Sequence, residues 1–259
     1  DMTFAKDAVL ARNRTLDATL SSQWLHGAIA KNLKADIEMV LRPTEPNFSK
    51  YRGYTFNDET VSFRSNPEMI FEGSLSEKGS VEITHTFTPL EKGPALLRAD
   101  FNLRVFEPSG SFSIGRASTK VYPFRTLIGI KPPESDNDRY GTWLNRDQMH
   151  TFNVVSVDGE GNPIGRRELE YEIYQIRWRW WWEKSRENLS NYFERENVRR
   201  IASGKVTTRS NGENAIQLKL PENADGGRYL IRVKDPSGNH SSSTVVYFNW
   251  GSRNNTSTS

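Results

Sequence analysis

The stretch Tyr171-Glu-Ile-Tyr-Gln-Ile-Arg-Trp-Arg-Trp-Trp-Trp182 places four of the chain's seven tryptophans in five consecutive positions, at the end of a strand-like run. Successive side chains of a strand point to opposite faces. The apolar side chains change face between Ile173 and Tyr174, and a β-bulge or a change in what covers the strand would explain this. One face carries Leu169, Tyr171 and Ile173, and the other carries Tyr174, Ile176, Trp178, Trp180 and Trp182.

The tryptophan run has two competing interpretations. Each buried aromatic ring removes roughly 150 to 250 Å² from water, so the run represents a large packing or binding surface. We predict that Trp178, Trp180 and Trp182 form an interface with a neighbouring domain or another partner. The alternative is an exposed tryptophan platform that stacks sugar rings in a glycan-binding or adhesive surface module. Stacking of nucleobases is less favoured, because glutamates stand among the nearby basic residues at positions 183, 187, 194 and 196.

Short alternating segments punctuated by glycine and proline extend outward from this run in both directions. They predict an all-β fold of two tandem antiparallel β-sandwiches with an immunoglobulin-like or fibronectin-III-like architecture. Helical composition is confined to Phe4–Arg12 and Ser185–Glu196. Strands are expected near residues 14–24, 34–41, 54–56, 80–87, 95–106, 111–122, 150–157, 169–182, 205–208, 215–220, 228–234 and 243–250.

The 259 residues suffice for two domains of about 100 to 150 residues each. The proline-rich and charged segment Lys131-Pro-Pro-Glu-Ser-Asp-Asn-Asp-Arg139 separates the two groups of strands. We therefore expect a linker or short helix over residues 1–13 and a first sandwich over 14–123. A linker over 124–140, a second sandwich over 141–250 and a flexible tail over 251–259 would follow.

Composition and spacing argue against an enzyme, a metal site or a bound cofactor. There is no cysteine, which excludes a thiol nucleophile and a thiolate zinc site in this segment. The histidines His26, His85, His150 and His240 are too far apart in sequence for a paired-ligand motif. A formal net charge of +3, with interleaved signs, lacks the dense basic face of a nucleic-acid binder. No apolar run reaches 18 residues, so no membrane insertion by this segment is expected.

Three loops carry oxygen-bearing side chains that could belong to a nucleophile or an ion-binding site. Gly110-Ser-Phe-Ser-Ile-Gly115 misses the G-x-S-x-G nucleophile spacing and indicates a hairpin turn. Asp158-Gly-Glu-Gly-Asn-Pro163 begins like a calcium loop, but it has proline where that loop requires glycine, so we interpret it as a turn. Asp235-Pro-Ser-Gly-Asn-His240 is interpreted as a strand connection, with a bound ion as the minor alternative.

Several of these segments together resemble the bacterial alpha-2-macroglobulin family. In the second half the resemblance lies in Phe152–Ile164, in Leu169–Tyr174 with the run Trp178–Trp182, and in Gly227–Ser241. The last of these contains a Gly-Arg-Tyr strand and an Asp-Pro, Ser-Gly, His loop, from which this chain departs by inserting Asn239 before His240. Residues Trp24–Glu38 are similar to the strand, Gly-x-x-Ala turn and strand of a preceding macroglobulin-like domain.

The resemblance implies tandem macroglobulin-like domains that serve as a non-catalytic scaffold. In the family such domains lie upstream of a protease-sensitive bait region and a thioester domain, and the whole protein inhibits proteases by trapping them in the periplasm or at the cell surface. It thereby acts in defence or host colonisation, and a lipoprotein anchor is one way in which the parent would be held at a membrane. The implied partners are neighbouring domains of the same parent chain and, for the intact parent, proteases. No Cys-x-x-Gln thioester motif and no bait segment are present here.

Overall fold

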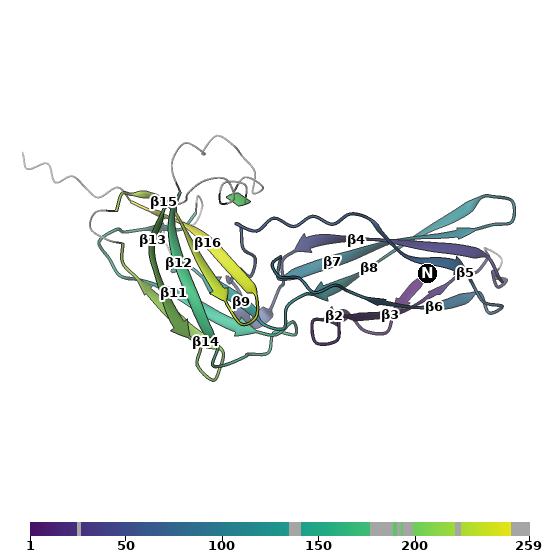
Figure 1. Ribbon diagram of the computed structural model, residues 1–259, viewed down its shortest axis with the longest axis horizontal. Coiled ribbons are helices and arrows are strands. Elements are labelled where there is room, and N and C mark those ends of the chain that lie inside the picture. Colours follow the sequence, from purple (N-terminus) through teal and green to yellow (C-terminus); the bar gives the residue numbers. More distant parts are fainter. Residues whose placement is uncertain are drawn as a thin grey trace, which may run out of the picture. The chain divides into compact units, whose positions relative to one another are not determined.

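The structure is a computed structural model that describes residues 1–24, 27–134, 141–176, 189–190, 193, 199–220 and 224–249. It confirms the all-β prediction, and each of its two compact units is a β-sandwich (Figure 1). The first unit comprises Asp1–Pro46 and Phe63–Arg125, and the second comprises Asn47–Ser62 and Thr126 onward. The chain therefore passes from one unit to the other after Pro46, after Ser62 and after Arg125.

The first sandwich packs a three-stranded sheet, in the order β1-β3-β6, against a five-stranded sheet, in the order β2-β8-β7-β4-β5. Alternation builds its core: on β7, Leu97, Ala99, Phe101 and Leu103 point inward and are almost fully buried. The strands are β1 (Met2–Phe4), β2 (Ala8–Leu10), β3 (Thr15–Ser21), β4 (Lys34–Thr44), β5 (Glu68–Ser74), β6 (Ser80–Thr86), β7 (Leu96–Phe106) and β8 (Phe112–Tyr122).

The second sandwich packs a three-stranded sheet, in the order β14-β11-β9, against a five-stranded sheet, in the order β10-β16-β15-β12-β13. Phe152, Ile173, Tyr229 and Phe248 lie at its centre with no exposed surface. The elements are the short 3-10 helix η1 (Ser49–Tyr51) and strands β9 (Leu127–Lys131), β10 (Trp143–Leu144), β11 (His150–Val157), β12 (Glu168–Ile176), β13 (Arg200–Thr207), β14 (Glu213–Leu218), β15 (Gly227–Asp235) and β16 (His240–Phe248).

The N-terminal segment differs from its sequence-based expectation. Residues 1–13 form neither a linker nor a helix: β1 pairs antiparallel with β3, and β2 pairs parallel with β8. The physical reason is that an isolated helix of nine residues is marginal in water, whereas each strand here finds backbone partners on a sheet edge. Val9 is buried, and Met2 and Phe4 pack against the same core.

Two further segments lie where the sequence pattern did not place them. Residues 127–131, expected in a linker over 124–140, form β9 of the second sandwich, because Leu127, Ile128 and Ile130 are completely buried there. Residues 47–62, expected in the first sandwich, belong to the second unit. Of the predicted helix Ser185–Glu196, the structure describes residues 189, 190 and 193, which are helical, and the rest lies outside the described residues.

Candidate functional site

The segment Asn47–Ser62, here called the docked segment, reaches the second sandwich from the middle of the first unit's sequence. Thr55 forms an isolated antiparallel bridge with Ile130 of β9, with N···O distances of 2.9 and 3.0 Å. The rings of Tyr51 and Phe56 are almost fully buried. Phe56 also packs edge-on against Phe48, with ring centroids 5.1 Å apart. The segment therefore adds apolar side chains and backbone hydrogen bonds to the edge of the three-stranded sheet.

Asp58 anchors the docked segment to strands β15 and β16 through a buried ion pair. Its carboxylate, which has no exposed surface, lies 2.6 Å from Nε of Arg232 and accepts a hydrogen bond of 2.6 Å from the Ser241 hydroxyl. The backbone N–H and hydroxyl of Thr60 donate to its other oxygen at 2.9 and 2.7 Å. Burial raises the pKa of Asp58, but Arg232 and the hydrogen bonds from Ser241 and Thr60 outweigh it and hold that pKa below its ordinary 3.8.

Backbone contacts extend this attachment along β16. The Ser243 N–H donates to the carbonyl of Asn57 at 3.1 Å, and the Ser243 hydroxyl accepts from the N–H of Glu59 at 2.8 Å. Ser243 is itself fully buried, so these groups satisfy each other where water has no access. The attachment thus depends on partners that are more than 170 residues away in sequence.

His240, at the start of β16, is held as a neutral imidazole. Its Nδ1 accepts a hydrogen bond of 2.9 Å from the backbone N–H of Ile128. An accepting Nδ1 requires the tautomer that carries its proton on Nε2. Burial lowers the pKa of His240 to about 4, against the opposing effects of Asp58 and Phe56. The imidazole therefore joins the β15–β16 hairpin to β9.

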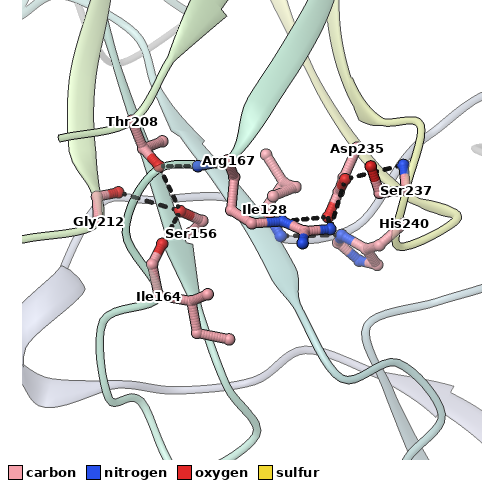
Figure 2. Close-up of polar contacts among 9 residues, drawn as sticks. All are labelled: Ile128, Ser156, Ile164, Arg167, Thr208, Gly212, Asp235, Ser237 and His240. Atoms are coloured by element: carbon pink, nitrogen blue, oxygen red, sulfur yellow. Dashed lines mark hydrogen bonds and ion pairs between the residues drawn. The ribbon is translucent and has the colours of Figure 1, made fainter. Parts of the chain in front are cut away.

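The loop between β15 and β16 is built around the buried carboxylate of Asp235 (Figure 2). The Arg167 guanidinium donates to both of its oxygens, at 2.8 Å from Nη2 to Oδ1 and 2.6 Å from Nη2 to Oδ2. The Ser237 N–H also donates to Oδ1 at 3.1 Å, and the Asn239 N–H donates to the Asp235 carbonyl at 2.9 Å. With its oxygens engaged in this way, the Asp235–His240 loop is the strand connection that its sequence indicated.

A second polar group in Figure 2 surrounds the buried hydroxyl of Ser156 on β11. Its Oγ lies within hydrogen-bonding distance of the carbonyls of Ile164 and Gly212, and 3.1 Å from the Thr208 hydroxyl. The Thr208 hydroxyl in turn accepts from the N–H of Arg167 at 2.9 Å. These bonds hold the loop after β11 beside the turn between β13 and β14.

On strand β12 the apolar side chains change from one face to the other before the tryptophan run. The pairing with β13 shifts register between Ile173 and Tyr174, but the extra residue lies on β13, and β12 pairs with β15 without a break. Ile173 belongs to the sandwich core, whereas Tyr174 and Ile176 contact a separate apolar cluster that includes Leu189 and Phe193. The rings of Tyr174 and Phe193 meet edge-on at 5.0 Å. The predicted interface residues Trp178, Trp180 and Trp182 lie outside the described residues.

The other sequence candidates are structural in the part of the chain that the structure describes. Gly110 lies in the turn between β7 and β8, and the Asp158 carboxylate caps the turn after β11 by accepting from the N–H groups of Glu160 and Asn162. Both turn predictions are confirmed. His85 packs edge-on against Phe87 in the first unit, and the His150 ring lies 2.6 Å from the Asn145 carbonyl in the second. His26 lies outside the described residues.

Comparison with known proteins gives the same answer for both halves of the chain. Residues 1–123 match the bacterial alpha-2-macroglobulin MG5 domain, and residues 129–250 match bacterial macroglobulin domain 6. The chain belongs to the bacterial alpha-2-macroglobulin family. The predicted resemblance is thereby confirmed.

Relatives of this macroglobulin segment are much longer than the segment itself. An alpha-2-macroglobulin homolog from Yersinia pestis is 26% identical over 164 residues, which are 62% of this chain and 8% of that protein. Trypsin-activated alpha-2-macroglobulin from Escherichia coli shares the fold over 98% of this chain and 17% of its own, with a TM-score of 0.64 and 16% identity. Salmonella alpha-2-macroglobulin reacted with methylamine aligns over 96% of this chain and 16% of its own, with a TM-score of 0.59 and 16% identity.

Sequence reasoning missed the residues that attach the docked segment of this macroglobulin pair. Asp58-Glu-Thr60 carries a local signal, because an aspartate that accepts from the N–H two residues onward is a common turn motif. Nothing local indicates that Arg232 completes the site. No helix among the described residues is long and apolar enough to span a membrane.

Proposed function

We propose that this chain is a non-catalytic scaffold section of a longer bacterial alpha-2-macroglobulin that inhibits proteases by trapping them, in the periplasm or at the cell surface. The observation that carries the proposal is the match of the two halves to consecutive macroglobulin domains, 5 and 6. Two ion pairs, Asp58–Arg232 and Asp235–Arg167, support a mechanical role. In each pair the carboxylate is buried and bound by the arginine of the same chain, so it holds the fold together and is not available to a substrate. Neighbouring domains of the parent chain are the partners that such a section would hold.

Protease challenge of the parent protein tests this function. We expect a broad-specificity protease to cleave the parent, change its conformation on a native gel and remain associated with it. The same protease inactivated beforehand at its active site is the control and should produce neither effect. We expect the 259-residue chain alone to leave protease activity unchanged. A cleaved parent that neither changes shape nor retains the protease would contradict the proposal.

We further propose that Trp178, Trp180 and Trp182 form the contact with a neighbouring domain of the parent. Support comes from β12, where Tyr174 and Ile176 already face a cluster outside the sandwich core. The three tryptophans continue the two-residue spacing of Tyr174 and Ile176, so in a continuous strand all five side chains would lie on one face. A strand that has turned its apolar face outward is suited to continue as a contact surface.

Replacing Trp180 and Trp182 together by alanine should lower the free energy of unfolding, or of domain association, by about 2 kcal/mol, as the loss of buried aromatic anchors does. The melting temperature of the parent measures the effect. Trp143→Ala is the matched control: Trp143 is 39% exposed and stacks on Tyr247 at 5.0 Å, so its loss should cost less. An unchanged melting temperature, together with sugar-dependent quenching of fluorescence that the double variant loses, would instead favour the glycan platform.

A further inference from the structure

The first sandwich contains a cavity that its own side chains leave unfilled. It has a volume of about 130 Å³ and is lined by β2, by the C-terminal parts of β4 and β8, and by the start of β7. Its floor is apolar and buried, and the partly buried Leu41 and Leu90 complete its walls. A cavity of about 150 Å³ with such a lining admits a benzene ring. The buried floor consists of Val9, Met39, Leu97 and Val121.

The mouth of this cavity carries a cation that the fold does not use. Arg14, His85 and Glu68 line the cavity, and none of the three is fully buried. The Arg14 guanidinium makes no hydrogen bond or ion pair with any residue that the structure describes, and Glu68 makes none with it. Elsewhere in the same sandwich the arginines Arg42, Arg98 and Arg104 do pair with carboxylates. A half-buried guanidinium with open donors beside an apolar cavity is suited to receive an anion.

The backbone holds Arg14 in this position. Its φ of 53° is left-handed, which an arginine rarely adopts without local support. Its N–H donates to the Leu10 carbonyl at 2.9 Å, and its own carbonyl accepts from the N–H of Phe87, a lining residue, at 2.8 Å. The turn after β2 is thus fixed to the segment after β6, and both border the cavity.

We propose that this cavity binds a small carboxylic acid, whose ring or short alkyl tail enters the apolar floor and whose carboxylate meets Arg14. This inference goes beyond the scaffold role and does not depend on it. Arg14 and Glu68 carry opposite charges at the cavity, and an anion is favoured over a cation because Arg14 is half-buried, whereas Glu68 is exposed to water, which screens its charge. The size of the cavity limits the apolar part to about one six-membered ring.

Titration of the 259-residue chain with three probes of similar size tests the proposal. Phenylacetate, 2-phenylethanol and phenethylammonium share the ring and differ in charge. We expect phenylacetate to bind at least about tenfold more tightly than the alcohol, because its carboxylate can accept a charge-assisted hydrogen bond from Arg14. We expect its amide chemical-shift changes to centre on Val9, Arg14 and residues 85–90. Equal affinity for all three probes, tighter binding of phenethylammonium, or no saturable binding would overturn the proposal.

Variants separate the charge from the cavity. Arg14→Gln should reduce phenylacetate affinity to that of the alcohol, and Leu41→Phe should abolish binding of both by filling the cavity. Leu90→Phe serves the same purpose if Leu41→Phe lowers the melting temperature. Arg116→Gln is the control, because this exposed arginine on the outer face of β8 does not line the cavity, and it should leave affinity unchanged. Phenylacetate binding that survives Arg14→Gln undiminished would overturn the assignment.

Discussion

Replacing Asp58 by alanine should lower the free energy of unfolding of the second sandwich by about 3 to 5 kcal/mol. Its carboxylate is fully buried, and four donors converge on it from Thr60, Ser241 and Arg232. Removing one partner of a buried pair leaves the other charge without compensation, and losses of about 3 to 5 kcal/mol follow. Urea unfolding measures the change, and hydrogen exchange assigns it to the second unit and to residues 47–62.

Trypsin cleavage within the docked segment measures the effect of Asp58→Ala at the segment itself. Lys50 and Arg52 are exposed within it, and both are sites at which trypsin cleaves. If Asp58 anchors the segment, the alanine variant should be cut there many times faster than the natural chain. Trypsin resistance equal to that of the natural chain would show that Tyr51 and Phe56 hold the segment without the ion pair.

Two comparisons isolate the buried pair. Asp100→Ala removes a carboxylate that Arg42 and Arg98 share on the exposed face of the first sandwich, and this should cost no more than about 1 kcal/mol. Replacing Arg232 by methionine in the Asp58→Ala background should restore part of the lost stability, because it removes the uncompensated charge. If the double variant were as unstable as the sum of the two single variants, the two residues would not be energetically coupled.

The strands that were predicted correctly are those whose information is local. On β7, and on β4 with Ala35, Ile37 and Met39, every second residue is apolar and buried, and this period reads directly from the sequence. The change of face at Ile173–Tyr174 was equally visible, and of its two predicted explanations the structure shows the change of cover. A second cluster covers Tyr174 and Ile176, and the irregularity in strand pairing lies on the partner strand β13.

The docked segment was not predictable because its information is distant. The strand predicted over residues 54–56 is only a single bridge at Thr55. The positions of Phe56 and Asp58 depend on Ile130, Arg232 and Ser243 in the other half of the sequence. The same holds for the N-terminal residues, whose short apolar groups are ambiguous until a sheet edge is available. The tertiary partners therefore decided the structure where the local pattern was weak.

Acidification should destabilise the second sandwich through His240. Its pKa is about 4 in the folded chain and about 6.5 when exposed, because burial disfavours the charged ring. Between these two values the unfolded chain binds a proton that the folded chain does not. Stability from this group is therefore complete above about pH 6.5 and is lost as the pH falls towards 4. The slope approaches about 1.4 kcal/mol per pH unit, for a total of about 3 kcal/mol.

Two carboxylates of the second sandwich, Asp58 and Glu172, act in a different pH range. Against the effect of burial, which raises both values, Arg232, Ser241 and Thr60 lower the pKa of Asp58, and Lys234 and Tyr174 lower that of Glu172. Their contributions to stability are therefore lost only as the pH falls below the ordinary pKa values of 3.8 and 4.5. A fall in stability between pH 6.5 and 4.5 is thus specific to a buried neutral base. Protonation of Nδ1 would also remove the acceptor that the Ile128 N–H requires.

His240→Asn provides the decisive comparison. The asparagine carbonyl can accept from Ile128 as Nδ1 does, but it does not titrate. Urea unfolding of both proteins at several pH values gives the difference in stability, in which contributions from the other histidines cancel. We expect the natural chain to lose about 3 kcal/mol more than the variant between pH 7 and pH 4. Parallel curves would mean that His240 takes up its proton in the folded chain as readily as in water. In that case the ring would not be the buried link between the β15–β16 hairpin and β9.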